Sequence, residues 1–331
     1  MNETVPMDPK ELKDRIKGII HLVMTHFDEN NRLDENALRK SINYTAKALR
    51  GEDAVFLAMG STAEFYSMNE QENKQAMRII VEEVDGRFPV IVGTGRAGTK
   101  PTIEMSQYAQ QIGADGVLIV NPYYLPATQE GLFRHFKKTA DSIDIGIMIY
   151  NNSAVSKLWI PPELMARLSK IENIIADKEN TANAIAYYWM QKALDPEDMV
   201  IICGLGQLMF PFFALYGCNG FVTEYANFAP DIALDLYKAA KEKNFDKIKQ
   251  LSDRIAPFHE FLAELARKRG FIPSILSPQL CSNELPFYQA VIKQAMALVG
   301  LPGGPAREPM ENLTKDEIQK LRTVLQRMAV L

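Results

Sequence analysis

Lys178 is the residue of this chain with the most evident chemical potential. It lies in the stretch 174–181, where a short apolar strand is expected to give way to a helix. A lysine at such a junction either pairs with a neighbouring carboxylate, here Asp177 or Glu179, or attacks a carbonyl carbon and forms a Schiff base. The second role requires a dry pocket that lowers the lysine pKa well below its ordinary value of roughly 10.4, because only the neutral amine attacks. Residues at other strand ends must decide between the two.

Polar residues also follow the ends of three other expected strands. Gly60, Ser61 and Thr62 follow the second, and they form either a carboxylate-binding turn of backbone N–H groups and hydroxyls or a plain Ser/Thr turn. Tyr150 ends the fifth, where its phenol either relays protons or packs in the core. Tyr124 lies beyond the fourth, close to the expected rim.

These positions require an alternation of strands and helices, and the sequence has one. The apolar runs expected to be buried strands are 18–24, 54–59, 90–92, 116–120, 146–150, 174–176, 200–203 and 220–223. Helix-start signals follow them, including Asn69 with Glu72, and Thr181 before a helix at 182–194. Eight such units favour a (β/α)8 barrel over an open doubly wound sheet.

We therefore divide the chain into three parts. Residues 1–17 are an N-terminal segment, residues 18–242 are the (β/α)8 barrel that carries the catalytic site, and residues 243–331 are a C-terminal helical region. Helices are expected there at 243–269, 285–299 and 314–328. In a barrel of this kind the site lies where strands end and the following loops begin.

Composition excludes several classes of function. The chain has 331 residues, 47% of them hydrophobic, and a net charge of −4, which predicts no nucleic-acid or membrane partner. Three cysteines without CxxC spacing and four dispersed histidines (His21, His26, His135 and His259) predict neither disulfides nor a metal site. The polar N-terminus has no signal-peptide pattern, so we expect a cytoplasmic protein.

A glycine pattern at Gly93, Gly95 and Gly98 formally matches a dinucleotide-binding loop, which would suggest a nicotinamide oxidoreductase. The third glycine, however, precedes the helix start at Thr99 instead of lying inside the helix. The candidate acidic residue, Asp115, is at the wrong end of the next strand. We expect no nucleotide and no other cofactor.

Four motifs occur in the order and spacing of one known family. They are Gly60-Ser-Thr-Ala-Glu64, Asn121-Pro-Tyr-Tyr124, Tyr150-Asn151 and Ala176-Asp-Lys-Glu179. The chain resembles the dihydrodipicolinate synthase / N-acetylneuraminate lyase family from about residue 18 to residue 313. The resemblance implies a class I, Schiff-base aldolase with a (β/α)8 barrel and a C-terminal helical region, usually a homotetramer.

The resemblance also implies roles for individual residues. Lys178 would form the Schiff base with pyruvate or another 2-keto acid, and Tyr150 would shuttle protons. Thr62 would link Tyr150 to Tyr124, which many members lend to a neighbouring subunit. The backbone amides of Ser61 and Thr62 would hold the carboxylate of the 2-keto acid. Gly204 would lie where the rest of the substrate rests.

Two departures from the family pattern bear on the substrate. Val155 stands where synthases carry an arginine for a second carboxylate, so dihydrodipicolinate synthase activity itself is disfavoured. Glu224, at the end of the eighth strand, is either a rim glutamate facing solvent or a group that binds substrate hydroxyls or acts as a second acid or base. The leading interpretation is a lyase that cleaves or forms an aldol bond. Dehydration of a keto-deoxy sugar acid and a non-catalytic ligand-binding barrel are the alternatives.

Overall fold

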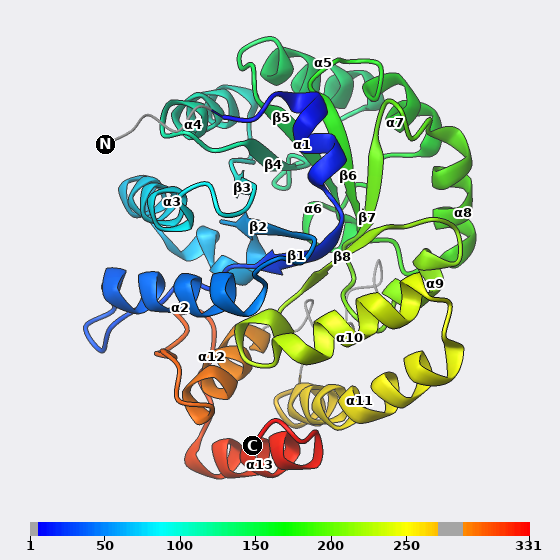
Figure 1. Ribbon diagram of the computed structural model, residues 1–331. Coiled ribbons are helices and arrows are strands. Elements are labelled where there is room, and N and C mark those ends of the chain that lie inside the picture. Colours follow the sequence, from blue (N-terminus) through cyan, green and yellow to red (C-terminus); the bar gives the residue numbers. More distant parts are fainter. Residues whose placement is uncertain (1–5, 271–286) are drawn as a thin grey trace.

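Eight parallel strands close into a barrel in the computed structural model, which describes residues 6–270 and 287–331 (Figure 1). Consecutive strands are neighbours, and β8 pairs with β1. The strands are β1 (Gly18–Leu22), β2 (Ala54–Ala58), β3 (Val90–Gly93), β4 (Gly116–Val120), β5 (Gly146–Asn151), β6 (Ile174–Glu179), β7 (Val200–Cys203) and β8 (Gly220–Thr223). The expected barrel with a C-terminal helical extension is confirmed.

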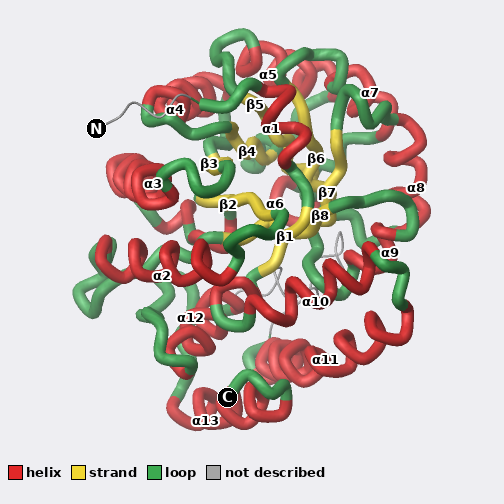
Figure 2. The backbone as a smooth tube through the Cα atoms, in the orientation of Figure 1, coloured by secondary structure: helices red, strands yellow, loops and turns green. Residues whose placement is uncertain are grey.

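Helices surround this barrel and extend beyond it (Figure 2). They are α1 (Pro9–Arg15), α2 (Glu35–Ala48), α3 (Glu70–Val84), α4 (Thr99–Gln111), α5 (Gln129–Ala140), α6 (Ser153–Ser156), α7 (Pro162–Leu168), α8 (Ala184–Ala193), α9 (Phe210–Ala214), α10 (Pro230–Lys241), α11 (Phe245–Lys268), α12 (Tyr288–Leu298) and α13 (Lys315–Arg327). Within the described residues, no helix is both long and apolar enough to cross a membrane.

The strands are buried on both faces, as parallel strands between a packed interior and a layer of helices must be. Alternate residues therefore belong to two apolar clusters. Ile147 and Ile149 of β5 face the surrounding helices, whereas Met148 and Tyr150 face the barrel interior. This alternation fixes which strand residues can reach a site inside the barrel mouth.

Several local signals act as expected. Asn69 and Glu72 form a reciprocal capping box at the start of α3, and Thr314 and Glu317 form another before α13. The expected cap at Thr181 is wrong. β6 continues to Glu179, and Asn183 caps α8 through hydrogen bonds from Ile185 and Ala186. The longer strand delays the helix start by two residues.

Two segments complete the barrel at its ends. In the N-terminal segment, α1 places the fully buried Leu12 against Gly116 and Gly146, which begin β4 and β5, so α1 covers the end opposite the expected site. At the other terminus, α11 packs against α10, and α13 packs against both α11 and α12 (Figure 1). The sequence predicts a helix at 285–299. Leu285 and Pro286 lie outside the described residues, Phe287 precedes the helix, and α12 begins at Tyr288.

Candidate active site

A one-residue irregularity in β6 determines where Lys178 points. Ile147 pairs with Ile174, but the next residue, Met148, pairs with Ala176. Ile175 is therefore an extra residue, and it shifts the register so that Lys178 pairs with Tyr150. Without that extra residue Asp177 would occupy the position opposite Tyr150, and the lysine would face the helices.

The amine of Lys178 is enclosed inside the barrel mouth. The residue is 4% exposed, and its Nζ lies over the ring of Tyr150, 3.6 Å from the ring centroid. Burial lowers the pKa of Lys178 from its ordinary value of 10.5 to about 7, because the charged ammonium loses hydration that nothing nearby fully replaces. A large fraction of this amine is therefore neutral and nucleophilic near pH 7.

The phenol of Tyr150 is held in place by the residues that follow β5. Asn152 caps α6 and donates a hydrogen bond from Nδ2 to the Tyr150 hydroxyl at 2.8 Å. Because the ring face contacts the Lys178 amine, the hydroxyl at its edge lies in the same enclosed space. The amine of Lys178 therefore contacts the ring face of Tyr150, whose hydroxyl is bonded to Asn152, and a proton-relay role for Tyr150 stays a prediction.

A small cavity of about 10 Å³ lies beside the amine, and we call it the inner cavity. Lys178 and Tyr150 line it together with the turn Gly60 to Ala63 that follows β2. This turn is a short 3-10 helix, Ser61–Ala63, whose first N–H groups have no partner within the helix itself. Such N–H groups can bind anions. Lys178, Tyr150, Ser61 and Thr62, which the sequence places near strand ends, thus line one cavity, and their individual roles stay predictions.

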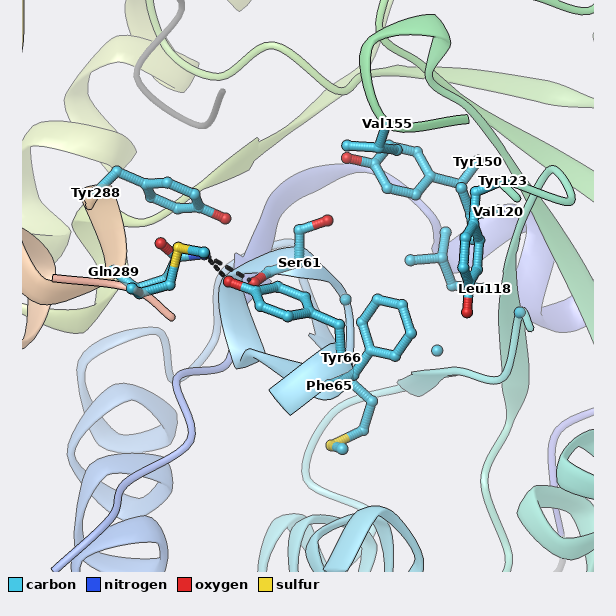
Figure 3. Close-up of a pocket in the computed structure, with 15 residues that line it drawn as sticks. Ser61, Phe65, Tyr66, Leu118, Val120, Tyr123, Tyr150, Val155, Tyr288 and Gln289 are labelled. Carbon is cyan, nitrogen blue, oxygen red and sulfur yellow. Dashed lines mark hydrogen bonds between the residues drawn. The ribbon is translucent and has the colours of Figure 1, made fainter. Parts of the chain in front are cut away.

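Tyr288 is a site residue that the sequence did not reveal. A hydrogen bond of 3.0 Å joins its hydroxyl to Thr62 Oγ1, and Tyr288 also lines the inner cavity. The next residue, Gln289, donates from Nε2 to the Ser61 carbonyl at 3.1 Å and to the Tyr66 hydroxyl at 3.0 Å (Figure 3). Both residues begin α12. Nothing in the local sequence of this apolar helix indicates that their side chains bond to residues of the turn after β2.

Buried charges fasten α12 to the turn after β2. Lys293 forms an ion pair with Glu64, and both side chains are fully buried. Glu64 has a left-handed backbone with φ of 55°, and its second carboxylate oxygen accepts a hydrogen bond from the Arg307 backbone N–H at 2.8 Å. Arg307 in turn contacts Glu72 through its guanidinium group. These contacts hold the turn after β2 and the C-terminal extension in one arrangement.

Three sequence-derived site residues, Tyr124, Gly204 and Glu224, line neither cavity. Tyr124 is 75% exposed, so its expected contribution to a neighbouring subunit stays a prediction. Gly204 packs against the end of β6, because a Cβ there would lie 2.9 Å from the Glu179 carbonyl oxygen. Glu224 is only 4% exposed and accepts a hydrogen bond from Gln207 at 3.0 Å, so the solvent-facing alternative is wrong.

The carboxylates beside Lys178 face away from it. Asp177 and Glu179 project from β6 toward the surrounding helices, and both are buried. Burial raises the pKa of both carboxyl groups, that of Glu179 to about 7. The neighbouring Glu179 raises the pKa of Asp177 further, whereas the interaction with Asp177 lowers that of Glu179. Neither carboxylate forms an ion pair with Lys178, whose amine lies on the Tyr150 ring, so the alternative that Lys178 pairs with Asp177 or Glu179 is wrong.

The glycine pattern after β3 has a packing explanation. A Cβ at Gly93 would lie 2.1 Å from the Met59 carbonyl oxygen, so this glycine permits the close approach of β2 and β3. Asp115 accepts hydrogen bonds from the backbone N–H groups of Val90 and Met7, at the opposite end of β3. Asp115 therefore has a structural role, because it joins the N-terminal segment to the start of β3.

A second cavity, of about 300 Å³, lies next to the inner one, and we call it the outer chamber. The two share five lining residues: Gly60, Ser61, Leu118, Tyr150 and Tyr288. Figure 3 shows its walls, with Phe65 and Tyr66 on one side, Tyr123, Tyr150 and Val155 on another, and Tyr288 and Gln289 on a third. The outer chamber is therefore a neighbour of the inner cavity that Lys178 borders.

Comparisons with known proteins agree with this geometry. The model of the dihydrodipicolinate synthetase family matches residues 15–271. A 4-hydroxy-tetrahydrodipicolinate synthase of Methanothrix thermoacetophila is 30% identical over 95% of this chain and 98% of its own length. A putative 2-dehydro-3-deoxy-D-gluconate aldolase, YagE of Escherichia coli, is 31% identical over 94% of this chain and 96% of its own length.

Solved structures give the same result. The structure of YagE in complex with pyruvate has a TM-score of 0.82 and 28% identity, covering 96% of this chain and 99% of that one. Dihydrodipicolinate synthase from Aquifex aeolicus has a TM-score of 0.80 and 28% identity, covering 95% and 98%. Since the family model matches most of the chain and relatives match nearly all of it, the protein belongs to the dihydrodipicolinate synthetase family and is a lyase of the class I aldolase type.

Proposed function

We propose that Lys178 forms a Schiff base with the C2 carbonyl of pyruvate or a related 2-keto acid, and that the enzyme makes or cleaves the bond between C3 and C4. The observation that carries the proposal is the buried amine of Lys178 on the ring face of Tyr150, beside the turn at Ser61 and Thr62. An amine with a pKa of about 7 attacks a carbonyl without first needing a strong base.

The turn after β2 orients the substrate in this proposal. Its backbone N–H groups at Ser61 and Thr62 bind the carboxylate of the 2-keto acid, which places the C2 carbonyl against Lys178. Tyr150 supplies the proton that the leaving oxygen of the carbinolamine requires, so that water departs and the iminium forms. No charge in the cavity other than the lysine is needed for this step.

The iminium then acts as an electron sink. The Tyr150 phenolate left by the previous step takes a proton from C3 and gives an enamine. C3 of the enamine attacks the carbonyl carbon of an aldehyde, and Tyr150 returns the proton to the resulting oxygen. Water releases the 4-hydroxy-2-keto acid and regenerates the amine. Cleavage is the same sequence in reverse.

Two alternatives use the same lysine. Dehydration of a keto-deoxy sugar acid also begins with the iminium, and dihydrodipicolinate synthesis is disfavoured because Val155 offers no charge to a second carboxylate. A barrel that binds its ligand without catalysis would form no covalent adduct. In the proposed assembly, a cytoplasmic homotetramer, Tyr124 extends from the surface to a neighbouring subunit, in agreement with its exposure.

Borohydride trapping tests the proposal. Incubation with pyruvate and sodium borohydride should add a reduced pyruvate group to Lys178, which peptide mass spectrometry locates. Lys178→Ala should abolish the adduct while the circular-dichroism spectrum stays that of the wild type. Lys192→Ala is the matched control, because Lys192 also lies over a tyrosine ring, that of Tyr188, but at the surface. An adduct that persists in Lys178→Ala would disprove the assignment.

A further inference from the structure

The outer chamber shares part of its wall with the inner cavity that Lys178 borders, and its larger volume offers room for the group attached to C3 of a bound 2-keto acid. We propose that this chamber binds the aldehyde half of the substrate and that this half is an uncharged aromatic aldehyde. The inference rests on the proposed function, because it assumes a 2-keto acid bound to Lys178.

Aromatic rings dominate the walls of the chamber. Five of the described residues that line it are aromatic: Phe65, Tyr66, Tyr123, Tyr150 and Tyr288. They come from the turn after β2, the loop after β4, the end of β5 and the start of α12, so they surround the space on several sides (Figure 3). Rings arranged in this way bind a planar aromatic group through face and edge contacts.

The described lining residues carry no charge at neutral pH. The charged groups nearest in sequence are engaged elsewhere: Glu64 pairs with Lys293, and Arg307 contacts Glu72. Arg96 lies over the ring of Phe65, 5.4 Å from its centroid, and donates from Nη1 to the Gly95 carbonyl. Its Nη2 is buried without a hydrogen-bond partner among the described residues, but Arg96 does not border the chamber. A carboxylate in the chamber would lose its hydration and contact no cation of the described lining, so an acidic aldehyde is a poor ligand.

A polyhydroxylated aldehyde fits less well for a related reason. The Tyr66 hydroxyl already accepts a hydrogen bond from Gln289, and the Tyr288 hydroxyl is bonded to Thr62. Hydroxyl groups of a sugar-like ligand would find one buried unpaired acceptor, Gln289 Oε1, but would otherwise compete with these bonds, and Leu118, Val120 and Val155 offer them no hydrogen bond. An apolar ligand gains free energy by leaving water for this surface, so the chamber discriminates by hydration as well as by shape.

The chemistry balances without any further reactant. The enamine carbon C3 forms a bond to the carbonyl carbon of the aldehyde, and the electron pair of that carbonyl moves to its oxygen, which takes a proton from Tyr150. Water then hydrolyses the iminium, which releases a 4-aryl-4-hydroxy-2-keto acid and restores the Lys178 amine. Nothing is oxidised or reduced.

An aldehyde panel tests the inference after pyruvate trapping has tested the proposed function. Pyruvate is condensed separately with benzaldehyde, D-glyceraldehyde and succinic semialdehyde, and kcat/KM is measured for each. Benzaldehyde should exceed the other two by about tenfold or more, the discrimination that a few apolar contacts provide. If pyruvate is trapped but benzaldehyde is not the preferred partner, or does not react, the inference is wrong while the proposed function stands. If pyruvate is not trapped, both fail.

Two variants locate the selectivity in the chamber. Val155→Arg introduces a cation at the wall, so the ratio of kcat/KM for benzaldehyde to that for succinic semialdehyde should fall by about tenfold. Val155→Leu keeps the wall apolar and should preserve the preference for benzaldehyde. The ratio does not depend on how much of a variant is correctly folded. An unchanged ratio in Val155→Arg would show that the aldehyde binds elsewhere.

Discussion

The hydroxyls of Thr62 and Tyr288 lie 3.0 Å apart, although 226 positions separate the residues in the sequence. Thr62 lies in the turn after β2, and Tyr288 begins α12 in the C-terminal extension. The extension therefore supplies a wall of the cavity beside Lys178 as well as a packing surface for the barrel. Helix α12 is thus part of the candidate site.

Replacing Tyr288 with phenylalanine should lower the rate of condensation. Phenylalanine fills the same space but has no hydroxyl to bond Thr62. The Thr62 hydroxyl is then no longer held in position beside Tyr150, so kcat should fall by about 10–100-fold. Steady-state kinetics and the pH profile measure the change. Tyr108→Phe is the control and should leave kcat unchanged. It removes a hydroxyl that donates a hydrogen bond to the Lys74 carbonyl, and Tyr108 lines neither cavity. Equal effects of both variants would indicate a loss of stability alone.

The rate of Schiff-base formation should rise with pH around neutrality. Burial lowers the pKa of Lys178 to about 7, so the nucleophilic neutral form accumulates as the pH passes through about 7 and is complete about one to two units above it. The initial rate of borohydride-trapped adduct formation, followed by mass spectrometry, gives the titration curve. If the rate continues to rise until the pH approaches the ordinary lysine pKa of 10.5, the Lys178 amine is exposed to water and its pKa is not lowered.

Removing Lys293 should destabilise the fold strongly. Lys293→Ala leaves the carboxylate of Glu64 buried without its cation, which costs about 3–5 kcal/mol of unfolding free energy. Denaturant unfolding measures the loss. Lys320→Ala breaks a pair with Glu264 in which both side chains are more than half exposed, and it should cost about 0–1 kcal/mol. If both variants lose the same stability, the buried pair does not fasten α12 to the barrel.

Glu224→Gln separates binding from later chemistry. Glu224 is buried beside Gln207, and its charge helps to raise the pKa of Tyr288, so it lies within electrostatic reach of the site. We expect turnover to fall by about tenfold or more, while borohydride trapping of pyruvate changes little. Rapid trapping and steady-state assays on the same preparation measure both quantities. Equal effects on the two, or none on either, would reject an acid–base or substrate-binding role.

The sequence by itself determined the barrel. Strands at Gly116–Val120, Val200–Cys203 and Gly220–Thr223 were predicted with their observed bounds, because buried parallel strands are short continuous apolar runs between turn signals. It also brought together Ser61, Thr62, Tyr150 and Lys178, since the ends of all strands in such a barrel meet at one mouth. These are consequences of local pattern and topology.

Only the tertiary structure decided the rest. The extra residue Ile175, which turns Lys178 inward, depends on pairing with β5, and the sequence of β6 alone does not reveal it. Tyr288 reaches Thr62 because a buried ion pair, Glu64 with Lys293, joins segments far apart in the chain. Such contacts have no local signature, since hydrogen bonds and ion pairs between remote segments depend on how elements pack and not on the periodicity within each of them.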